Sequence, residues 1–84
     1  MITIYGAEWC AWCKKAKELA EDRQLRYEWK DVEDPDVYDE MKSRIPPAKT
    51  SIPQIFWDKR HVGGYTDFAI EVENTIGGYG DGRL

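Results

Sequence analysis

The two cysteines of this 84-residue chain, Cys10 and Cys13, lie three residues apart between a short apolar run and a helical pattern. A thiolate is the nucleophile of disulfide exchange, and the first turn of a helix stabilises it with unpaired amides and a positive dipole end. A sulfur one turn later is close enough to attack a mixed disulfide formed on the first. The spacing therefore predicts dithiol chemistry, with Cys10 as the attacking sulfur and Cys13 as the resolving one.

The segments on either side of the cysteines predict a strand-helix-strand unit. Residues 2–5 are typical of a short strand, a helical pattern runs from Cys13 to about Arg23, and residues 25–32 alternate as a second strand. A right-handed crossover through the helix makes the two strands parallel. The cysteine turn is then expected at the carboxyl end of the first strand.

The second half of the chain predicts a short helix followed by a hairpin. Residues 37–41 carry one apolar stripe, and the prolines within 45–47 must end that helix. Residues 50–57 predict a strand preceded by a proline. Residues 61–64 predict its hairpin partner, across a turn at 58–60.

A final helix is predicted to begin near Thr66 or Asp67, with Asp67 able to serve as its N-cap. The glycine-rich tail from Gly77 is expected to fray. The predicted buried stripe of this helix recurs every four positions, at Phe68, Val72 and Ile76.

Size and charge restrict what the chain can be. Residues 1–84 are enough for one domain with one core, without linker or repeat. A net charge of -4 and a pI near 4.9 argue against nucleic acid and anionic membranes as partners. The chain has no apolar run of membrane-spanning length, and it starts as a strand rather than a leader, so we expect a cytoplasmic protein. A two-residue disulfide loop would stabilise little, which favours catalytic cysteines.

Three sequence blocks, in this order, resemble the glutaredoxin family of the thioredoxin-like superfamily: Cys10-Ala11-Trp12-Cys13 after Ile4-Tyr5, then residues 51–56, then residues 61–67. A lone C-x-x-C is a weak signal, whereas the three together are specific. The resemblance implies an α/β fold, with a four-stranded mixed sheet flanked by about three helices. It also implies a cis peptide bond before Pro53.

The resemblance further implies a site for glutathione beside the cysteines. The residue before a cis proline presents unpaired backbone groups to an extended ligand, a Gly-Gly turn permits close approach, and a helix start attracts a carboxylate. An aspartate there can pair with the ligand's ammonium. The implied glutathione-binding residues are Trp12, Lys49, Ile52, Pro53, Gly64, Tyr65, Thr66 and Asp67.

Two positions depart from the family pattern. Many glutaredoxins have a proline where this chain has Ala11, and a lysine where it has Ala7. Losing the lysine removes a cation near the thiolate and the ligand, and Lys49 is placed to replace part of it. Losing the proline relaxes the turn and can shift the reduction potential in either direction.

The predicted function is a glutathione-dependent thiol–disulfide oxidoreductase that reduces protein disulfides and glutathione mixed disulfides. Glutathione would be its co-substrate, no cofactor would be tightly bound, and the resemblance implies ribonucleotide reductase as a client. We expect a monomer.

The alternative functions are a redoxin reduced by thioredoxin reductase, an iron-sulfur module shared between two subunits, and a non-catalytic adaptor. Zinc is not expected, because His61 is the sole further nitrogen or sulfur ligand besides the two cysteines.

The remaining aromatic and basic residues have ordinary structural interpretations. Trp9, Trp29 and Trp57 are predicted to be core or half-buried side chains. His61 is predicted to be a structural or surface histidine of the hairpin. The lysines within residues 14–17 predict a solvated helix face, or a basic rim if they flank the cysteines.

Overall fold

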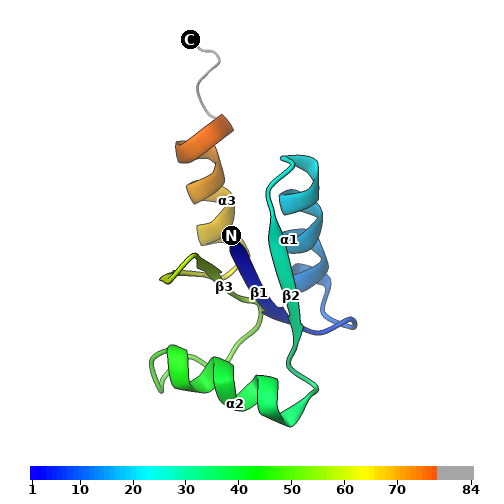
Figure 1. Cartoon of the computed structure of the whole chain (residues 1–84), viewed down its shortest axis with the longest axis vertical. Coiled ribbons are helices and arrows are strands. Elements are labelled where there is room, and N and C mark those ends of the chain that lie inside the picture. Colours follow the sequence, from blue (N-terminus) through cyan, green and yellow to red (C-terminus); the bar gives the residue numbers. More distant parts are fainter. Residues whose placement is uncertain (78–84) are drawn as a thin grey trace.

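The computed structural model describes residues 1–77, whose four strands form one mixed sheet (Figure 1). The strand order is β2-β1-β3-β4. β1 is parallel to β2, whereas β3 is antiparallel to both of its neighbours. The strands are β1 (Ile2–Gly6), β2 (Tyr27–Asp31), β3 (Gln54–Trp57) and β4 (Arg60–Gly63).

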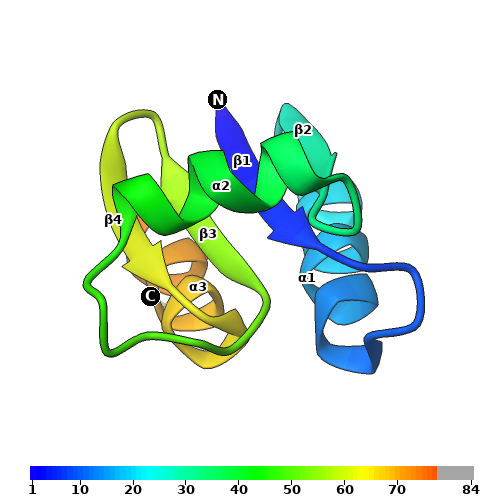
Figure 2. The same ribbon diagram turned by 90° about the horizontal axis from the view of Figure 1, so that it is seen from below.

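Helices cover both faces of this sheet. α1 and α3 lie side by side on one face, and α2 crosses the opposite face (Figures 1 and 2). A π-helical turn, η1 (Glu73–Gly77), continues α3. The fold predicted from the sequence is therefore confirmed. The helices are α1 (Ala11–Asp22), α2 (Pro35–Arg44) and α3 (Tyr65–Val72).

The alternation of β1 divides the core into two clusters, one on each face. Ile2 and Ile4 point towards α1 and α3, while Tyr5 points towards α2. Phe68 and Val72, two residues of the predicted apolar repeat, are buried in the cluster between α1, α3 and the sheet. The side chain of Ile76 lies outside the described part of the structure, as do residues 78–84 of the predicted frayed tail.

Some element boundaries differ from the prediction. α1 begins at Ala11 rather than Cys13, because Cys10 already has the extended backbone of an N-cap. β3 begins at Gln54, directly after the proline predicted to precede the strand, because Pro53 has no N–H to donate to a ladder. α3 begins at Tyr65, because its N-cap is Gly64 and not Thr66 or Asp67.

A buried tyrosine attaches α2 to the sheet. The Tyr5 hydroxyl donates to the Glu40 carboxylate and accepts a hydrogen bond from Arg44 Nη1 at 2.8 Å. Glu40 also pairs with Lys30 at 3.1 Å, and the Arg44 guanidinium lies 3.9 Å from the centre of the Phe56 ring. Burial, followed by the hydrogen bond to Glu40, raises the pKa of Tyr5. The hydroxyl therefore stays protonated and holds two charged side chains of α2 in place.

Tyr5→Phe should lower the free energy of unfolding by about 1–3 kcal/mol, because Glu40 and Arg44 lose their shared partner at a buried position. Urea denaturation followed by tryptophan fluorescence measures the change. Tyr27→Phe is the matched control, because the Tyr27 hydroxyl also donates to a glutamate, Glu21, but at the surface. Equal losses in the two variants would contradict a special role for the buried hydroxyl.

Candidate active site

The cysteine turn joins the carboxyl end of β1 to α1. Cys10 is the N-cap of α1, and its Sγ accepts a hydrogen bond from the Cys13 backbone N–H at 3.3 Å. Both cysteines are free thiols; Cys10 is half-buried and Cys13 is fully buried. Only Cys10 is therefore within reach of a substrate, at the positive end of the helix dipole.

Burial determines the protonation state of Cys13. Its side chain packs so closely on β1 that a Cβ on Gly6 would lie 2.8 Å from the Cys13 Sγ. Burial, followed by the hydrogen bond and charge of Cys10, raises the pKa of Cys13 to about 12, against a lowering by the Ala7 backbone. Cys13 is therefore a protonated thiol at neutral pH, held behind the accessible sulfur.

The segment entering β3 forms the second side of the site. The peptide bond between Ile52 and Pro53 is cis, as the resemblance implies, and the Ile52 carbonyl oxygen lies 4.0 Å from Cys10 Sγ. A Cβ on Gly64 would be in ordinary contact with the Pro53 carbonyl oxygen, at 3.8 Å. The starts of α1, β3 and α3 therefore meet on one side of the molecule (Figure 2).

An aromatic pair connects the two helix starts. The rings of Trp12 and Tyr65 have centroids 5.4 Å apart and are tilted by 41°. Trp12 remains 55% exposed, and Lys15 Nζ lies 5.6 Å from the centre of its ring. The pair borders the space between Cys10 and the start of α3, where the sequence predicts a ligand.

The start of α3 has free backbone donors. Its N-cap, Gly64, makes no side-chain capping bond, so the suggestion that Asp67 is the N-cap is wrong. Asp67 instead lies in the first turn, and its carboxylate folds over Gly63, where a Cβ would be 2.5 Å from Oδ2. Thr66 and Asp67 are both exposed. The first-turn amides and one carboxylate are therefore available to a ligand.

Gly63→Ala should disturb this helix start more than Gly64→Ala. Gly63 has φ = 123°, which an alanine adopts only with strain, and the new Cβ would displace Asp67. We expect a loss of about 1–2 kcal/mol in unfolding free energy and a raised KM for glutathione mixed disulfides. Gly64 has φ = -90° and room for a Cβ, so it is the control. Indistinguishable variants would contradict the argument.

Lys49 and His61 lie on the β4 side of the site. Lys49 is exposed in the turn after α2, where its backbone N–H donates to the Pro46 carbonyl at 3.0 Å. Burial lowers the pKa of His61, the Lys49 charge lowers it further, and Asp67 opposes them. The His61 ring stacks on Phe56 and its Nε2 is 2.7 Å from Gln54 Oε1, which confirms a structural histidine.

Trp9, which precedes Cys10, is more exposed than its sequence pattern predicts. It was predicted to be core or half-buried, but it is 69% exposed, and its Nε1 donates to Glu33 Oε2 at 2.6 Å. Trp29 and Trp57 are half-buried, as predicted. Trp9 lies in the short loop between β1 and α1, which has no periodicity, so the hydrophobic pattern could not place it.

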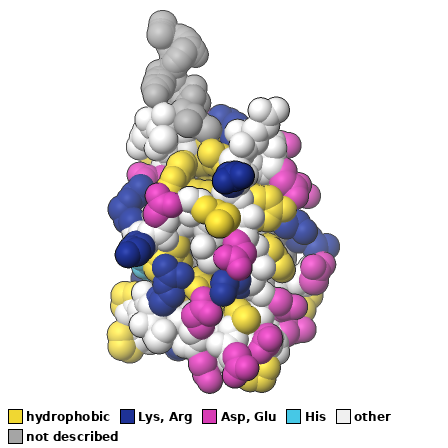
Figure 3. Space-filling model, in the orientation of Figure 1, with side chains coloured by type: hydrophobic (Ala, Val, Ile, Leu, Met, Phe, Trp, Pro, Cys, Tyr) yellow, Lys and Arg dark blue, Asp and Glu magenta, His cyan; other side chains and the backbone are white. Residues whose placement is uncertain are grey.

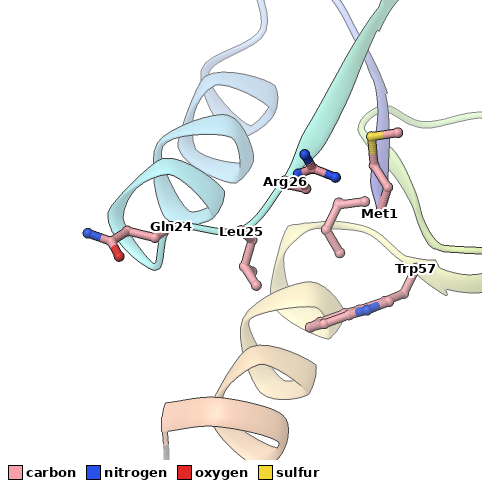
Figure 4. A pocket seen from close by; sticks show the side chains of 6 residues that line it. Met1, Gln24, Leu25, Arg26 and Trp57 are labelled. Atoms are coloured by element: carbon pink, nitrogen blue, oxygen red, sulfur yellow. The ribbon is translucent and has the colours of Figure 1, made fainter.

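A pocket of about 250 Å³ lies at the other end of the sheet (Figure 4). It surrounds the amino end of β1, whereas the cysteines follow the carboxyl end of that strand. Its lining contains no thiol, histidine or carboxylate, so it offers no group for the predicted exchange. The lining residues are Met1, Ile2, Gln24, Leu25, Arg26 and Trp57.

The described residues contain neither a metal-ligand cluster nor a membrane-spanning helix. Within residues 1–77, no three histidine, cysteine or carboxylate side chains gather in a way that could hold a metal ion. No helix of that part of the chain is long and apolar enough to cross a membrane.

The fold and the paired cysteines define a thiol–disulfide oxidoreductase of the thioredoxin-like class. The family model for glutaredoxin matches residues 2–62. Glutaredoxin 1 of Escherichia coli is 33% identical over 79 residues, which cover 87% of this chain and 93% of that protein. The chain belongs to the glutaredoxin family.

Solved structures agree with this assignment. Reduced Escherichia coli glutaredoxin superposes with a TM-score of 0.76 and 31% identity, covering 89% of this chain and 95% of that one. A buckwheat glutaredoxin, determined as a complex with glutathione, has a TM-score of 0.71 and 18% identity, covering 90% and 70%. The second similarity is one of fold alone.

Proposed function

We propose that this glutaredoxin uses glutathione to reduce protein disulfides and glutathione mixed disulfides, with Cys10 as nucleophile and Cys13 as resolving thiol. The observation that carries the proposal is the position of Cys10. Its half-buried Sγ is at the start of α1 and 4.0 Å from the Ile52 carbonyl oxygen, with the uncapped start of α3 beyond Gly64. The proposed nucleophile thus lies beside the segment that we propose binds a peptide-like ligand.

Glutathione fits the groups around Cys10. It would extend along Ile52 and Pro53 in the manner of an added strand, with its sulfur at Cys10. Its γ-glutamyl carboxylate would accept hydrogen bonds from the first-turn amides of α3, and Asp67 would pair with the ammonium. Trp12 and Tyr65 would cover its apolar side, and Lys49 would offer a cation to the second carboxylate. Membership of the glutaredoxin family supports this choice of ligand, and one protein of this fold, the buckwheat glutaredoxin, has been solved with glutathione bound.

Reduction of a protein disulfide takes two exchange steps. The Cys10 thiolate attacks one client sulfur, so a Cys10–client bond forms, the client disulfide breaks, and the departing thiolate takes up a proton. Cys13 then loses its proton and attacks the Cys10 sulfur. The Cys10–Cys13 bond forms, the client leaves as a dithiol, and two electrons have passed to it.

Two molecules of glutathione restore the enzyme. The first, as a thiolate, attacks Cys10, forming a Cys10–glutathione bond and releasing Cys13 as a thiol. The second attacks the sulfur of the bound glutathione, so oxidised glutathione leaves and Cys10 returns as a thiolate. A small glutathione mixed disulfide is reduced without any part for Cys13. The Cys10 thiolate attacks the glutathione sulfur of that disulfide, a Cys10–glutathione bond forms, and the other sulfur leaves as a thiolate and takes up a proton. A second glutathione then attacks the bound glutathione as above.

The test is turnover of a small glutathione mixed disulfide with two alternative reductants. One assay supplies glutathione and glutathione reductase, and the other supplies thioredoxin reductase. We expect turnover in the assay with glutathione and glutathione reductase, and none in the assay with thioredoxin reductase. Turnover with thioredoxin reductase alone would overturn glutathione dependence, and absence of turnover in both assays would overturn the catalytic role.

The proposal extends to client and assembly. We propose ribonucleotide reductase as one client, which the resemblance implies, and a monomeric enzyme. Deoxyribonucleotide formation by an oxidised ribonucleotide reductase, with this protein and glutathione as the electron source, tests the first. Sedimentation of the reduced protein at micromolar concentration tests the second.

A further inference from the structure

An exposed tryptophan stands beside the nucleophile on the side away from the proposed glutathione site. Trp9 directly precedes Cys10, is 69% exposed, and belongs to neither hydrophobic cluster of the described residues. Its indole N–H donates to Glu33 at 2.6 Å, which fixes the ring relative to the loop after β2. A large aromatic face fixed in solvent next to a reactive sulfur is a surface for a partner, because burying it gains free energy.

The segment after β2, to which Trp9 is hydrogen-bonded, is acidic. Residues 31–36 contain four carboxylates and no lysine or arginine, and all four are exposed. The Val32 backbone N–H donates to the Gly6 carbonyl at 3.0 Å, which brings this loop to the carboxyl end of β1, beside the cysteine turn. Acidic side chains gather over this part of the molecule, at the lower right of Figure 3. The carboxylates are Asp31, Glu33, Asp34 and Asp36.

Within residues 1–77, none of these carboxylates forms an ion pair. The ion pairs among the described residues involve Asp58, Glu73, Glu40 and Glu71, and none involves residues 31–36. Lys14 and Lys15 are the basic residues in the first turns of α1. Lys15 lies over the Trp12 ring, on the side of Cys10 opposite to Trp9. The surface around Cys10 is thus asymmetric: basic towards Lys15 and acidic towards Trp9.

We infer that Trp9 and residues 31–36 form a docking surface for client proteins whose disulfide is flanked by lysine or arginine. The inference rests on the proposed function, because it names the class of protein disulfide that Cys10 attacks. A basic side chain of the client would lie over the indole face of Trp9 and pair with the carboxylates behind it. Glutathione, on the Trp12 side, would not touch this surface.

Two synthetic peptides test the preference. Both contain the same disulfide loop, flanked by lysine and arginine in one and by aspartate and glutamate in the other. Mixing the fully reduced protein with each peptide gives a second-order rate constant for a single turnover, without glutathione or a reductase. The basic peptide should react about tenfold faster at low ionic strength, and the difference should shrink as salt is added.

Matched variants separate the contributions of charge and ring. Neutralising the loop with Asp31→Asn, Glu33→Gln and Asp34→Asn keeps every hydrogen-bond acceptor, so the tenfold preference should fall close to one. A control loses the same charge elsewhere, at three exposed positions without ion pairs, and should keep the preference. Trp9→Ala should slow the basic peptide about two- to fivefold relative to the acidic one. The control substitutions are Glu18→Gln, Asp22→Asn and Glu28→Gln.

The outcomes distinguish this inference from the proposed function. Equal rates for the two peptides with the unmodified protein overturn the docking surface, even if glutathione mixed disulfides are still reduced. A preference that survives the combined substitution of Asp31, Glu33 and Asp34 overturns it as well. A clear peptide preference without glutathione-dependent turnover would support the docking surface and overturn the choice of glutathione.

Discussion

Replacing Cys10 with serine is expected to slow exchange with every disulfide substrate by about a thousandfold or more. The serine hydroxyl is not ionised at neutral pH, so the helix start no longer holds a nucleophile. Cys13 cannot take over, because its side chain is fully buried and protonated. Turnover of a glutathione mixed disulfide and of a protein disulfide, measured in parallel with glutathione and glutathione reductase, gives both losses.

Cys13→Ser is the matched variant. It should retain reduction of the glutathione mixed disulfide and lose most reduction of the protein disulfide, because only the second needs a resolving thiol. A general loss of fold in either variant would reduce both of its activities, so the comparison of the two substrates separates a resolving role from a folding defect. Equal activity losses in Cys10→Ser and Cys13→Ser, on both substrates, would contradict the assigned roles.

Most of the fold could be predicted because its signals are local. The alternation of β1 and the helical periodicity of α1 each predict one element from a few neighbouring residues. The cysteine turn and the Gly-Gly turn then indicate where α1 and α3 begin. Parallel pairing of β1 and β2 then follows from the handedness of the crossover. The predicted starts of two helices were less accurate, because a capping residue sets each of them: Cys10 places the start of α1, and Gly64 places the start of α3.

The site was predictable where residues are adjacent in sequence and not where tertiary contacts decide. Cys10 and Cys13 follow from their spacing alone. The partner of Trp9 is 24 positions away, at Glu33, and no periodicity connects the two. The same is true of Tyr5, whose hydroxyl joins Glu40 and Arg44 across 35 and 39 positions. Hydrogen bonds between distant polar side chains leave no pattern in a single sequence.

The pKa of Cys13 should fall when Cys10 is covalently capped. Burial raises this pKa first, and the hydrogen bond and charge of Cys10 raise it further. A cap on the Cys10 sulfur removes the effects of its hydrogen bond and its charge on the pKa of Cys13, and leaves the effect of burial. The pKa of the capped protein should therefore lie below that of the reduced protein but remain above the ordinary value for a thiol.

Carbamidomethylation provides the cap, because it modifies the accessible Cys10 as a stable thioether. Carbon-13 NMR of labelled cysteine then follows Cys13 through a pH titration of the capped and reduced proteins, with Cys10→Ala as a control that removes the sulfur altogether. Unchanged titration of Cys13 in both would mean that burial alone sets its pKa. A lower pKa has a direct kinetic meaning, because resolution needs the Cys13 thiolate, whose fraction grows about tenfold per pH unit below the pKa. Since a client on Cys10 acts as a cap, the resolving thiol would be activated only once a mixed disulfide has formed.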